Sequence, residues 1–506
     1  MRTQLEVERK FTVDDGFRPD RVPLADGLVL AAADELDLRS TYVDTPDLRL
    51  AARGVTLRRR TGGVDDGWHL KLPAGPDGRT EVHEPPGPEG TTPPERLRHL
   101  VAVHVRDGRL LPVARLRTRR AVYRITDGSP DAPVLAELVD DRVTAESLGE
   151  EMTVTTWREL EVELADGGAD LLDRVEQSLR AAGAEPAPGP SKLLRALGDR
   201  VPHPAAVPEI GRRSTAADVV LAYVTAQVRA LTDADPGVRL NTPDAVHQMR
   251  VASRRLRSAL KTFRDVLDRG RTDPLRAELR WLAHVLGGAR DTEVMHARVR
   301  TLLLAGPDDE ARVVTVRRVD HELGERHGRA LGAARTELDG ARYFRVLDDL
   351  DALLADPHLT SRAGRPARKE LPRRVRSAYR DVRRCHDLAE AASPGREREL
   401  ALHEVRKAAK RARYAAEAVA PVAGKRARRF AGAMEEIQDV LGEHRDSIVT
   451  QEILAGTVAR AREAGEDTFA LGRVVGLEEA GATAAAAGYA EAWRAGSRKK
   501  LRAWAT

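Results

Sequence analysis

The sequence has little of what several classes of protein require. One residue of 506 is cysteine, Cys385, which excludes an internal disulfide framework and a cysteine-rich metal site. Aromatic residues make up 4% of the chain, so few rings are available to stack on nucleic-acid bases. No run of about 18 apolar residues occurs, and a strand pattern begins within five residues of the start, which leaves no room for a signal peptide. We therefore expect a cytoplasmic protein with no membrane partner.

The charge balance is close to neutral, so its distribution along the chain matters more than its total. The 84 lysines and arginines exceed the 79 aspartates and glutamates by 5. A surplus of this size is compatible with ordinary solubility, but the bases are clustered, which favours an anionic partner. The length predicts two to four domains at about 100–200 residues each.

Two periodicities divide the chain. Residues 1–200 alternate between apolar and polar residues in the manner of strands, and residues 213–500 repeat apolar residues at helical spacing. A proline-containing linker at 201–212 separates them. The predicted fold class is a multidomain α+β protein with an antiparallel β domain followed by an all-α domain. We expect strands at 3–11, 54–60, 67–72, 79–84, 116–125, 134–143 and 157–164, and helices at 169–182 and from about Ser191.

Charged residues alternate with apolar ones in the predicted strands. Glu6, Glu8 and Lys10 share one strand face because they are two residues apart. One strand of this kind is typical of a half-exposed sheet. Several strands carrying both signs instead predict a closed barrel with acids and bases in its interior. The other strands of this kind carry Arg58 and Arg60, His69 and Lys71, Glu137 and Asp141, and Glu159, Glu161 and Glu163.

Such an interior suits a phosphate chain with its metal ions. Carboxylates are hard oxygen ligands for Mg²⁺ or Mn²⁺, and arginine and lysine bind phosphate oxygens. A glycine-rich phosphate loop and a Ser/His/Asp or Cys/His nucleophile are both missing from the sequence. We interpret His69 and His83 as structural or surface histidines rather than metal ligands.

An ordered set of motifs in residues 1–200 resembles the CYTH family, also called triphosphate tunnel metalloenzymes. The opening Glu6-x-Glu8-x-Lys10 is similar to that family's ExExK signature. The further matches, in family order, are Tyr42-x-Asp44-Thr45-Pro46, Leu57-Arg58-x-Arg60, Leu70-Lys71, Arg79-x-Glu81, Glu137-x-x-x-Asp141, the Glu159/Glu161/Glu163 strand and Ser191-Lys192.

The resemblance implies an eight-stranded antiparallel tunnel with flanking helices that binds and hydrolyses a triphosphate. The catalytic residues it implies are Glu6, Glu8 and Lys10. The metal ligands it implies, for Mg²⁺ or Mn²⁺, are Glu6, Glu8, Asp141, Glu161 and Glu163. The phosphate-binding residues it implies are Lys10, Arg58, Arg60, Lys71, Arg79, Arg120 and Lys192. Arg120 is the best match on a strand that also carries Arg117 and Arg119.

Two segments of the C-terminal half are copies of one another. Val246–Arg257 recurs loosely as Leu402–Arg413, 156 positions later, and Leu286–Asp291 recurs as Leu441–Asp446, 155 positions later. Two landmarks at one offset indicate a duplicated unit, and that unit carries a row of positive charge. We expect the Arg-Asp pair that ends each Leu-Gly segment to close a helix, either as an ion pair or in contact with a ligand.

The duplicated helix has a basic face. His247, Arg250, Arg254 and Arg257 fall on one stripe at 3.6 residues per turn. Stacked cations without acids repel one another, so an anionic ligand is favoured over a solvated face. The stripe predicted to face the core is Met249, Leu256, Leu260 and Phe263 in the first copy, and Leu402, Val405, Ala409 and Ala412 in the second. A metal site of His247 and His403 is disfavoured, because no further ligand recurs around both.

These repeats are similar to the CHAD family, the conserved-histidine α-helical domain. The resemblance covers residues 213–500 and implies two pseudo-repeated helical bundles, at about 213–350 and 365–500, that bind inorganic polyphosphate. The residues it implies in binding are His247, Arg250, Arg254, Arg255, Arg257, His403, Arg406, Lys407, Lys410, Arg411 and Arg413. Nucleic acid is a weaker competitor, because aromatics are scarce and no helix-turn-helix or zinc pattern is recognised.

The combined prediction is a metal-dependent triphosphatase joined to a polyphosphate-binding domain. The second domain would hold the protein on polyphosphate granules or deliver chain ends to the tunnel. The alternatives are a non-catalytic polyphosphate-binding module and a thiamine triphosphatase or adenylate cyclase that uses the same tunnel. The sequence gives no signal for an oligomeric state.

Overall fold

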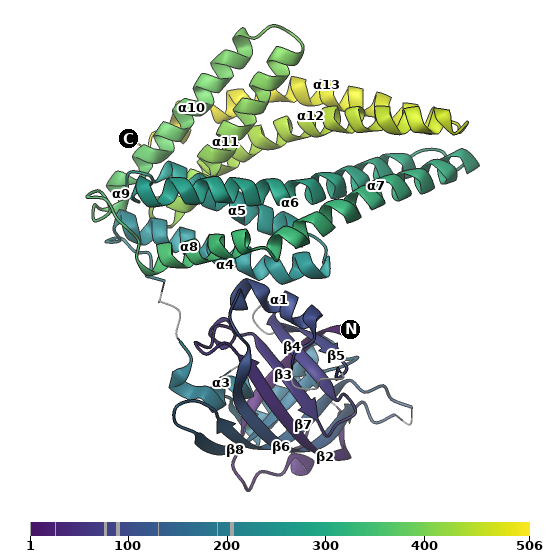
Figure 1. Cartoon of the computed structure of the whole chain (residues 1–506), viewed down its shortest axis with the longest axis vertical. Helices are drawn as coiled ribbons and strands as arrows, with labels where there is room; N and C mark the ends of the chain where they lie inside the picture. Colours follow the sequence, from purple (N-terminus) through teal and green to yellow (C-terminus); the bar gives the residue numbers. More distant parts are fainter. Residues whose placement is uncertain are drawn as a thin grey trace. The chain divides into compact units, whose positions relative to one another are not determined.

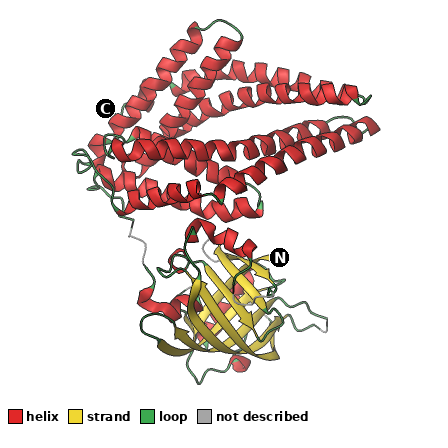
Figure 2. Cartoon of the chain, in the orientation of Figure 1, coloured by secondary structure: helices red, strands yellow, loops and turns green. Residues whose placement is uncertain are grey.

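The chain folds into two compact units, Met1–Ala206 and Val207–Thr506 (Figure 1). The computed structural model describes residues 2–25, 27–74, 78–87, 92–129, 131–189, 191–202 and 207–505. The first unit is a closed antiparallel barrel with short helices and the second is helical (Figure 2), which confirms the predicted α+β class. Residues 203–206 of the predicted linker lie outside the described residues. None of the helices in the described ranges is both long and apolar enough to cross a membrane.

Eight strands form the barrel, in the order β5-β4-β3-β2-β6-β7-β8-β1, and pairing of β1 with β5 closes it. A ninth strand, β9 (Glu185–Pro186), pairs with the end of β1. The barrel strands are β1 (Arg2–Thr12), β2 (Val29–Asp44), β3 (Thr56–Thr61), β4 (Gly67–Pro73), β5 (Gly78–Glu84), β6 (Leu111–Thr126), β7 (Ala136–Ser147) and β8 (Thr153–Leu164). The helices of this unit are α1 (Glu95–Val105), α2 (Ala169–Ala181) and α3 (Lys192–Leu197).

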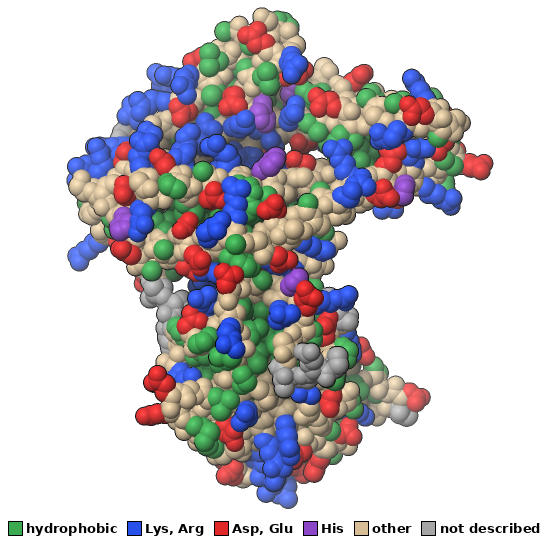
Figure 3. Space-filling model, in the orientation of Figure 1, with side chains coloured by type: hydrophobic (Ala, Val, Ile, Leu, Met, Phe, Trp, Pro, Cys, Tyr) green, Lys and Arg blue, Asp and Glu red, His purple; other side chains and the backbone are tan. Residues whose placement is uncertain are grey.

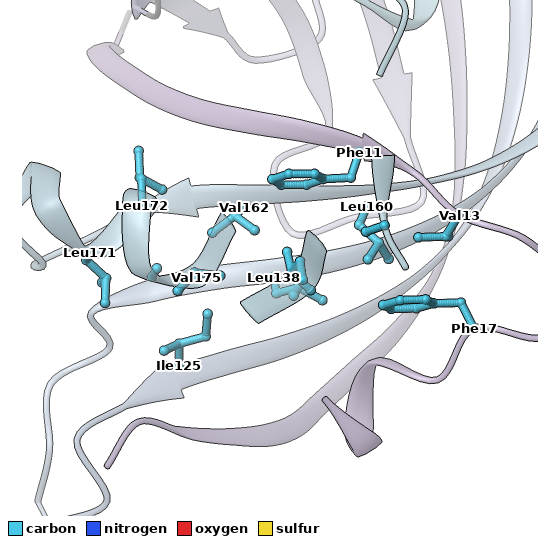
Figure 4. Close-up of a cluster of buried hydrophobic side chains, with 13 residues drawn as sticks. Phe11, Val13, Phe17, Ile125, Leu138, Leu160, Val162, Leu171, Leu172 and Val175 are labelled. Carbon is cyan, nitrogen blue, oxygen red and sulfur yellow. The ribbon is translucent and has the colours of Figure 1, made fainter. Parts of the chain in front are cut away.

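In β1, β7 and β8 the face that carries the predicted acids points into the barrel, because the opposite face is covered by apolar packing. Phe11, Leu138 and Leu160 belong to a buried cluster that includes side chains of α2 (Figure 4). Leu193 and Leu197 of α3 belong to a second buried cluster. Since strand side chains alternate between faces, burying one face outside the barrel directs the neighbouring residues inward.

Two elements of the barrel unit differ from the sequence prediction. Strand β2 was not predicted, because an Ala-Ala-Ala stretch and a register shift between Ala32 and Glu35 interrupt its alternation. Helix α1 was not predicted either. It follows the Gly- and Pro-rich segment 85–94, which favours turns, and Pro94 is its N-cap residue.

The second unit repeats one helical arrangement. In the first copy α4, α5, α6 and α7 pack in sequence, and in the second α10, α11, α12 and α13 do the same. The helices of the first copy are α4 (Ala216–Leu240), α5 (Ala245–Thr262), α6 (Arg269–Leu304), α7 (Glu310–Leu338) and α8 (Ala341–Ala355). Those that follow are α9 (Ala367–Glu370), α10 (Pro372–Ala391), α11 (Arg396–Ala423), α12 (Lys425–Glu463) and α13 (Phe469–Gly496).

The two copies pack on each other at two places. The long hairpins α6–α7 and α12–α13 (Figure 1) share a buried cluster that includes Val299, Leu303, Leu454 and Leu471. Helix α5 packs against α11, which brings the two copies of the basic segment together. The predicted core stripes are confirmed, since all eight of their side chains are buried.

The prediction that an Arg-Asp pair closes a helix in each copy is wrong. Arg290-Asp291 lies inside α6, and Arg445-Asp446 lies inside α12. The Leu-Gly sequence before each pair suggested a helix end, but a glycine inside a helix can also make room for a neighbouring side chain. In this protein Gly287 and Gly442 make room for arginine side chains of the neighbouring helices.

Candidate functional site

The barrel encloses a cavity of about 370 Å³ lined by side chains of both charges. It contains every phosphate-binding residue predicted for the barrel, and all the predicted metal ligands except Asp141. The acids that line it are Glu6, Glu8, Asp65, Glu81, Glu137, Glu161 and Glu163. The bases that line it are Arg2, Lys10, Arg58, Arg60, Lys71, Arg79, Arg120 and Lys192.

One end of α3 places a buried lysine among three carboxylates. The backbone N–H of Leu194 donates to Ser191 Oγ at 3.2 Å, which caps α3 and sets its first residue, Lys192. Lys192 Nζ lies 2.9 Å from Asp141, 2.8 Å from Glu159 and 2.8 Å from Glu161. Burial would lower the pKa of this lysine, but the three carboxylates together raise it above its ordinary value.

Asp141 lies behind the cavity wall rather than on it. Its carboxylate receives two hydrogen bonds from the Arg120 guanidinium, at 2.8 and 2.6 Å, and is fully buried. Burial opposes ionisation of Asp141, but Arg120 and Lys192 outweigh it and hold its pKa below the ordinary value. Arg120, which also donates to Glu161 at 3.2 Å, is therefore the arginine of β6 that reaches the cavity, whereas Arg117 is exposed and pairs with Asp37.

The other two predicted lysines are also paired with acids. Lys10 forms ion pairs with Glu161 and, at 3.2 Å, with Glu8, its neighbour along β1. Lys71 of β4 forms an ion pair with Glu6 of β1. Acids and bases inside the barrel thus compensate each other.

The arginines of β3 are compensated less completely. Arg58 donates to the Tyr42 hydroxyl at 3.1 Å, and Arg79 of β5 donates to the Gly54 carbonyl at 2.8 Å. Arg60 pairs with Asp65, yet burial, followed by the charges of Arg58 and Arg120, lowers its pKa to about 9. A phosphate chain would supply the negative charge that this wall lacks.

Glu6 and Glu81 are neighbouring carboxyl groups of the barrel cavity that are joined by a hydrogen bond. Burial and a hydrogen bond with Glu81 raise the pKa of Glu6 to about 8. His69, buried on β4, contacts Glu81 through Nδ1 at 2.9 Å, and burial lowers the pKa of this histidine to about 4. His69 is therefore a neutral partner of Glu81 on the cavity wall.

Three glutamates on neighbouring strands line the barrel cavity. Glu8 of β1 is opposite Glu163 of β8, which is in turn opposite Glu137 of β7. In the described ranges Glu163 has no hydrogen-bond or ion-pair partner, and burial, then the nearby Glu8 and Glu161, raises its pKa. By chemistry and register these donors fit Mg²⁺ or Mn²⁺. No three His, Cys, Asp or Glu side chains within the described residues are gathered as in a formed metal site.

A second charged site lies where α5 meets α11. Figure 3 shows lysine and arginine side chains around a hollow on this part of the helical unit. Lys410 of α11 is half-buried, and burial, then the charges of Arg254, Arg406 and Arg250, lowers its pKa to about 6. Arg254, Arg406 and Lys410 have no acidic partner among the described residues. We call Arg250, Arg254, Arg406 and Lys410 the central cluster.

The repeated Leu-Gly…Asp motif seats the cluster's arginines. The Gly287 Cβ position would lie 3.7 Å from Arg250 Nη2, and that of Gly442 only 3.2 Å from Arg406 Nη2. One turn further along α6, Asp291 pairs with Arg250 at 2.6 Å. In the second copy the charge of Arg406 opposes the burial-driven rise in the pKa of Asp446. Asp291 therefore pairs with Arg250, in the basic stripe, rather than with its neighbour Arg290.

Several predicted polyphosphate-binding residues lie outside the central cluster. Arg255 and Arg413 both pair with Glu417, at 3.1 and 2.7 Å, and Lys407 is exposed and pairs with Glu404 at 2.7 Å. The two predicted histidines are half-buried, and burial followed by neighbouring cations lowers the pKa of each. Arg257 and Arg411 adjoin the cluster on one side and have no acidic partner in the described ranges.

Sequence reasoning left out Glu81, His69, Gly287 and Gly442 as site residues. Glu81 lies on the same strand face as Arg79, and His69 on the same face as Lys71, because the residues of each pair are two apart. The strand period could therefore have identified both as cavity-lining residues. The glycines recur at the offset of the duplication, so the repeat marked them, but only packing shows what they accommodate.

Comparison with known proteins shows the same two parts. Residues 4–196 match the model of the CYTH domain, and residues 222–455 match that of the CHAD domain. These matches define a class of two-domain proteins in which a CYTH barrel precedes a CHAD helical domain. Uncharacterised proteins from two strains of Mycobacterium tuberculosis are 39% identical over 486 residues, 92% of this chain and 91% of theirs. The chain belongs to this CYTH–CHAD family.

Two solved structures match more than half of the chain at low identity. PptA from Streptomyces chartreusis is 23% identical and covers 56% of this chain and 100% of its own, with a TM-score of 0.46. The CHAD domain from the plant Ricinus communis is 23% identical and covers 58% and 96%, with a TM-score of 0.45. The CYTH family in general comprises metal-dependent phosphate-chain hydrolases or cyclases, and it commonly uses Mg²⁺ or Mn²⁺.

Proposed function

We propose that the barrel hydrolyses inorganic triphosphate or a related triphosphate, and that the helical unit binds inorganic polyphosphate. The observation that carries the first part is the mixed lining of the barrel cavity. A site for an anion alone would gain nothing from buried glutamates, since they repel it. Glu137 and Glu163, which have no ion-pair partner in the described residues, lie beside Glu8 and support a site for phosphate together with a cation.

The basic wall would hold the phosphate chain while water attacks its terminal phosphorus. Arg58, Arg60 and Arg79 would bind phosphoryl oxygens, and Lys10, Lys71 and Lys192 would exchange carboxylate partners for phosphate. A bound Mg²⁺ or Mn²⁺, held by Glu8 and Glu163 with Glu6 and Glu161 nearby, would neutralise charge on the phosphoryl oxygens and orient the water.

Polyphosphate as ligand of the helical unit is supported by the central cluster. The four cations of the central cluster have one ion pair in the described residues, Arg250 with Asp291, and Asp446 lies near Arg406, so positive charge remains that a polyanion would compensate. Inorganic polyphosphate supplies charge at every unit and needs no stacking partner, which fits a site without exposed aromatics better than nucleic acid does.

A phosphate-release assay tests the catalytic proposal. Purified full-length protein is given triphosphate, thiamine triphosphate, ATP or long-chain polyphosphate, with Mg²⁺, with Mn²⁺ or with chelator. We expect release from triphosphate in either metal and none with chelator. ATP conversion to cyclic AMP would indicate the cyclase alternative, and faster turnover of thiamine triphosphate would reassign the substrate.

The second candidate is a non-catalytic module that binds polyphosphate. It is favoured by one observation: the carboxylates of Glu6, Glu161 and Asp141 are engaged by lysine or arginine side chains of the barrel itself. If no substrate turns over with any metal while polyphosphate still binds, this candidate replaces the enzyme.

A further inference from the structure

The two copies of the basic segment differ in charge at matched positions. Arg257 of α5 and Arg413 of α11 are equivalent, 156 positions apart. One helical turn after each, the first copy has Lys261 and the second has Glu417, again 156 positions apart. On the following helix, Arg280 of α6 corresponds to Glu435 of α12, 155 positions apart, so two bases in the first copy are acids in the second.

In the second copy these acids neutralise the basic stripe. Arg413 Nε lies 2.7 Å from Glu417, and Arg413 Nη2 lies 2.8 Å from Glu435. Glu417 also holds Arg255 of the first copy at 3.1 Å, and Arg255 and Arg413 both lie over the Tyr414 ring. Beyond Lys410 on this side, a bound polyanion would meet carboxylates.

In the first copy the stripe continues without neutralisation. Helix α5, which carries Arg257, packs against α6, which carries Arg276 and Arg280, and against α11, which carries Arg411. Burial, then the charges of Arg280, Arg276 and Arg411, lowers the pKa of Arg257. Lys261 lies near Arg411, Arg276 and Arg264, with Asp381 as the one acid whose charge opposes them. Arg276 pairs with Asp273 of its own helix, whereas no described residue pairs with Arg257, Lys261, Arg280 or Arg411.

We infer that bound polyphosphate extends from the central cluster to one side only, along a surface that we call the one-sided track: Arg257, Lys261, Arg280 and Arg411. On the opposite side the carboxylates of Glu417 and Glu435 repel the phosphate chain. This inference rests on the proposed binding of polyphosphate. At the three matched positions 257, 261 and 280 the net charge is +3, against −1 at 413, 417 and 435. The affinity of a phosphate chain too short to extend beyond the central cluster should not depend on this charge difference, whereas the affinity of a longer chain should.

Reversing the charges on each side of the central cluster tests the inference in the full-length protein. The Lys261→Glu/Arg280→Glu variant gives the first copy the acids of the second, and Glu417→Lys/Glu435→Arg does the reverse. Two probes are used, tripolyphosphate and long-chain polyphosphate, and affinity is measured by titration calorimetry at several salt concentrations. Matched controls with the same charge change are Arg326→Glu/Arg329→Glu on α7 and Glu479→Lys/Glu491→Arg on α13, where all four side chains are exposed.

We expect K261E/R280E to weaken long-chain binding at least about tenfold beyond its matched control, while tripolyphosphate binding changes by the control's factor. The slope of log affinity against log salt should fall by about two, one for each lost phosphate contact. E417K/E435R should tighten long-chain binding beyond its control. A circular dichroism spectrum and melting temperature for each variant show that the fold is kept.

Each other outcome has a definite meaning. If the unmodified protein binds neither probe, the proposed polyphosphate function fails. If it binds long chains but K261E/R280E matches its control, or both probes weaken by the same factor, the one-sided track is wrong while polyphosphate binding stands. If E417K/E435R misfolds, the Glu417→Gln single variant is measured in its place, and unchanged or weaker long-chain binding there counts against the inference.

Discussion

Two buried lysines, one in each unit, have opposite surroundings. Lys192 in the barrel lies within 2.9 Å of three carboxylates, which raise its pKa. Lys410 in the helical unit lies among arginines, and burial with their charges lowers its pKa to about 6. The barrel therefore compensates its own charge, and a ligand must exchange partners there. The central cluster is compensated less completely, with Asp291 as the ion-pair partner of Arg250 in the described residues, so the proposed anion would not have to displace an acid from Arg254 or Lys410.

The largest effect should come from removing the barrel's acids. A Glu6→Gln/Glu8→Gln variant should lose about a thousandfold in turnover, because the cation that balances the phosphoryl charge would lose its oxygen ligands. Polyphosphate retention by the helical unit should not change. Phosphate release and polyphosphate binding are measured on the same preparation. If binding falls along with turnover, the two units do not act independently.

Replacing the two lysines should affect stability in opposite directions. Lys192→Met removes the cation that Asp141, Glu159 and Glu161 share and leaves these buried carboxylates with fewer basic partners. It should cost about 3 kcal/mol of barrel stability. Lys410→Met relieves repulsion among arginines and should raise the melting temperature of the helical unit. Thermal unfolding of each unit is followed by limited proteolysis with mass spectrometry. A loss of stability in both variants would mean that Lys410 has a structural partner.

Neutralising the central cluster should separate binding from folding. Arg254→Gln/Lys410→Gln should weaken long-chain polyphosphate binding about thirtyfold, at about 1 kcal/mol per lost phosphate contact, while triphosphate turnover in the barrel stays unchanged. Lys407→Gln is a matched control, since Lys407 is exposed and paired with Glu404. Equal losses in the control would indicate nonspecific attraction by the surface.

The pH dependence of polyphosphate affinity should follow Lys410. Its pKa of about 6 in the free protein means that it is mostly neutral at pH 8, and bound phosphate would raise that pKa. Binding above pH 6 would then take up a proton, and affinity should fall by up to about tenfold per pH unit between pH 6 and 8. Calorimetry in buffers of different ionisation enthalpy measures the uptake, which should disappear in Lys410→Met.

The affinity of the barrel for its cation should depend on pH in the opposite direction, and less strongly. Glu6, with a pKa raised to about 8, gives up its proton when a cation binds. Metal affinity should therefore rise with pH up to about 8 and then level off. A Glu81→Gln variant, which removes the neighbouring carboxyl group, should flatten this rise in a metal titration. Identical profiles in the two proteins would mean that the pair does not control metal binding.

The strand and helix periods of the sequence determined much of how the residues of both sites are arranged. Alternation at Glu6, Glu8 and Lys10 placed them on one face, and helical spacing placed Arg250 and Arg254 on one stripe, because these periods follow from backbone geometry alone. The sequence also marked the duplication by its constant offset. It did not reveal β2, whose alternation is interrupted, or the course of α6 through Gly287 and Asp291.

Only the tertiary structure decided which charges meet. The sequence places Asp141 and Glu163 in the same pattern, but packing buries one behind Arg120 and leaves the other facing the cavity. It likewise gives Arg257 and Arg413 the same position in the repeat, although Glu417 and Glu435 neutralise only the second. The physical reason is range: periodicity is a local property of the backbone, whereas the interaction of two charges depends on distances that folding sets across the chain.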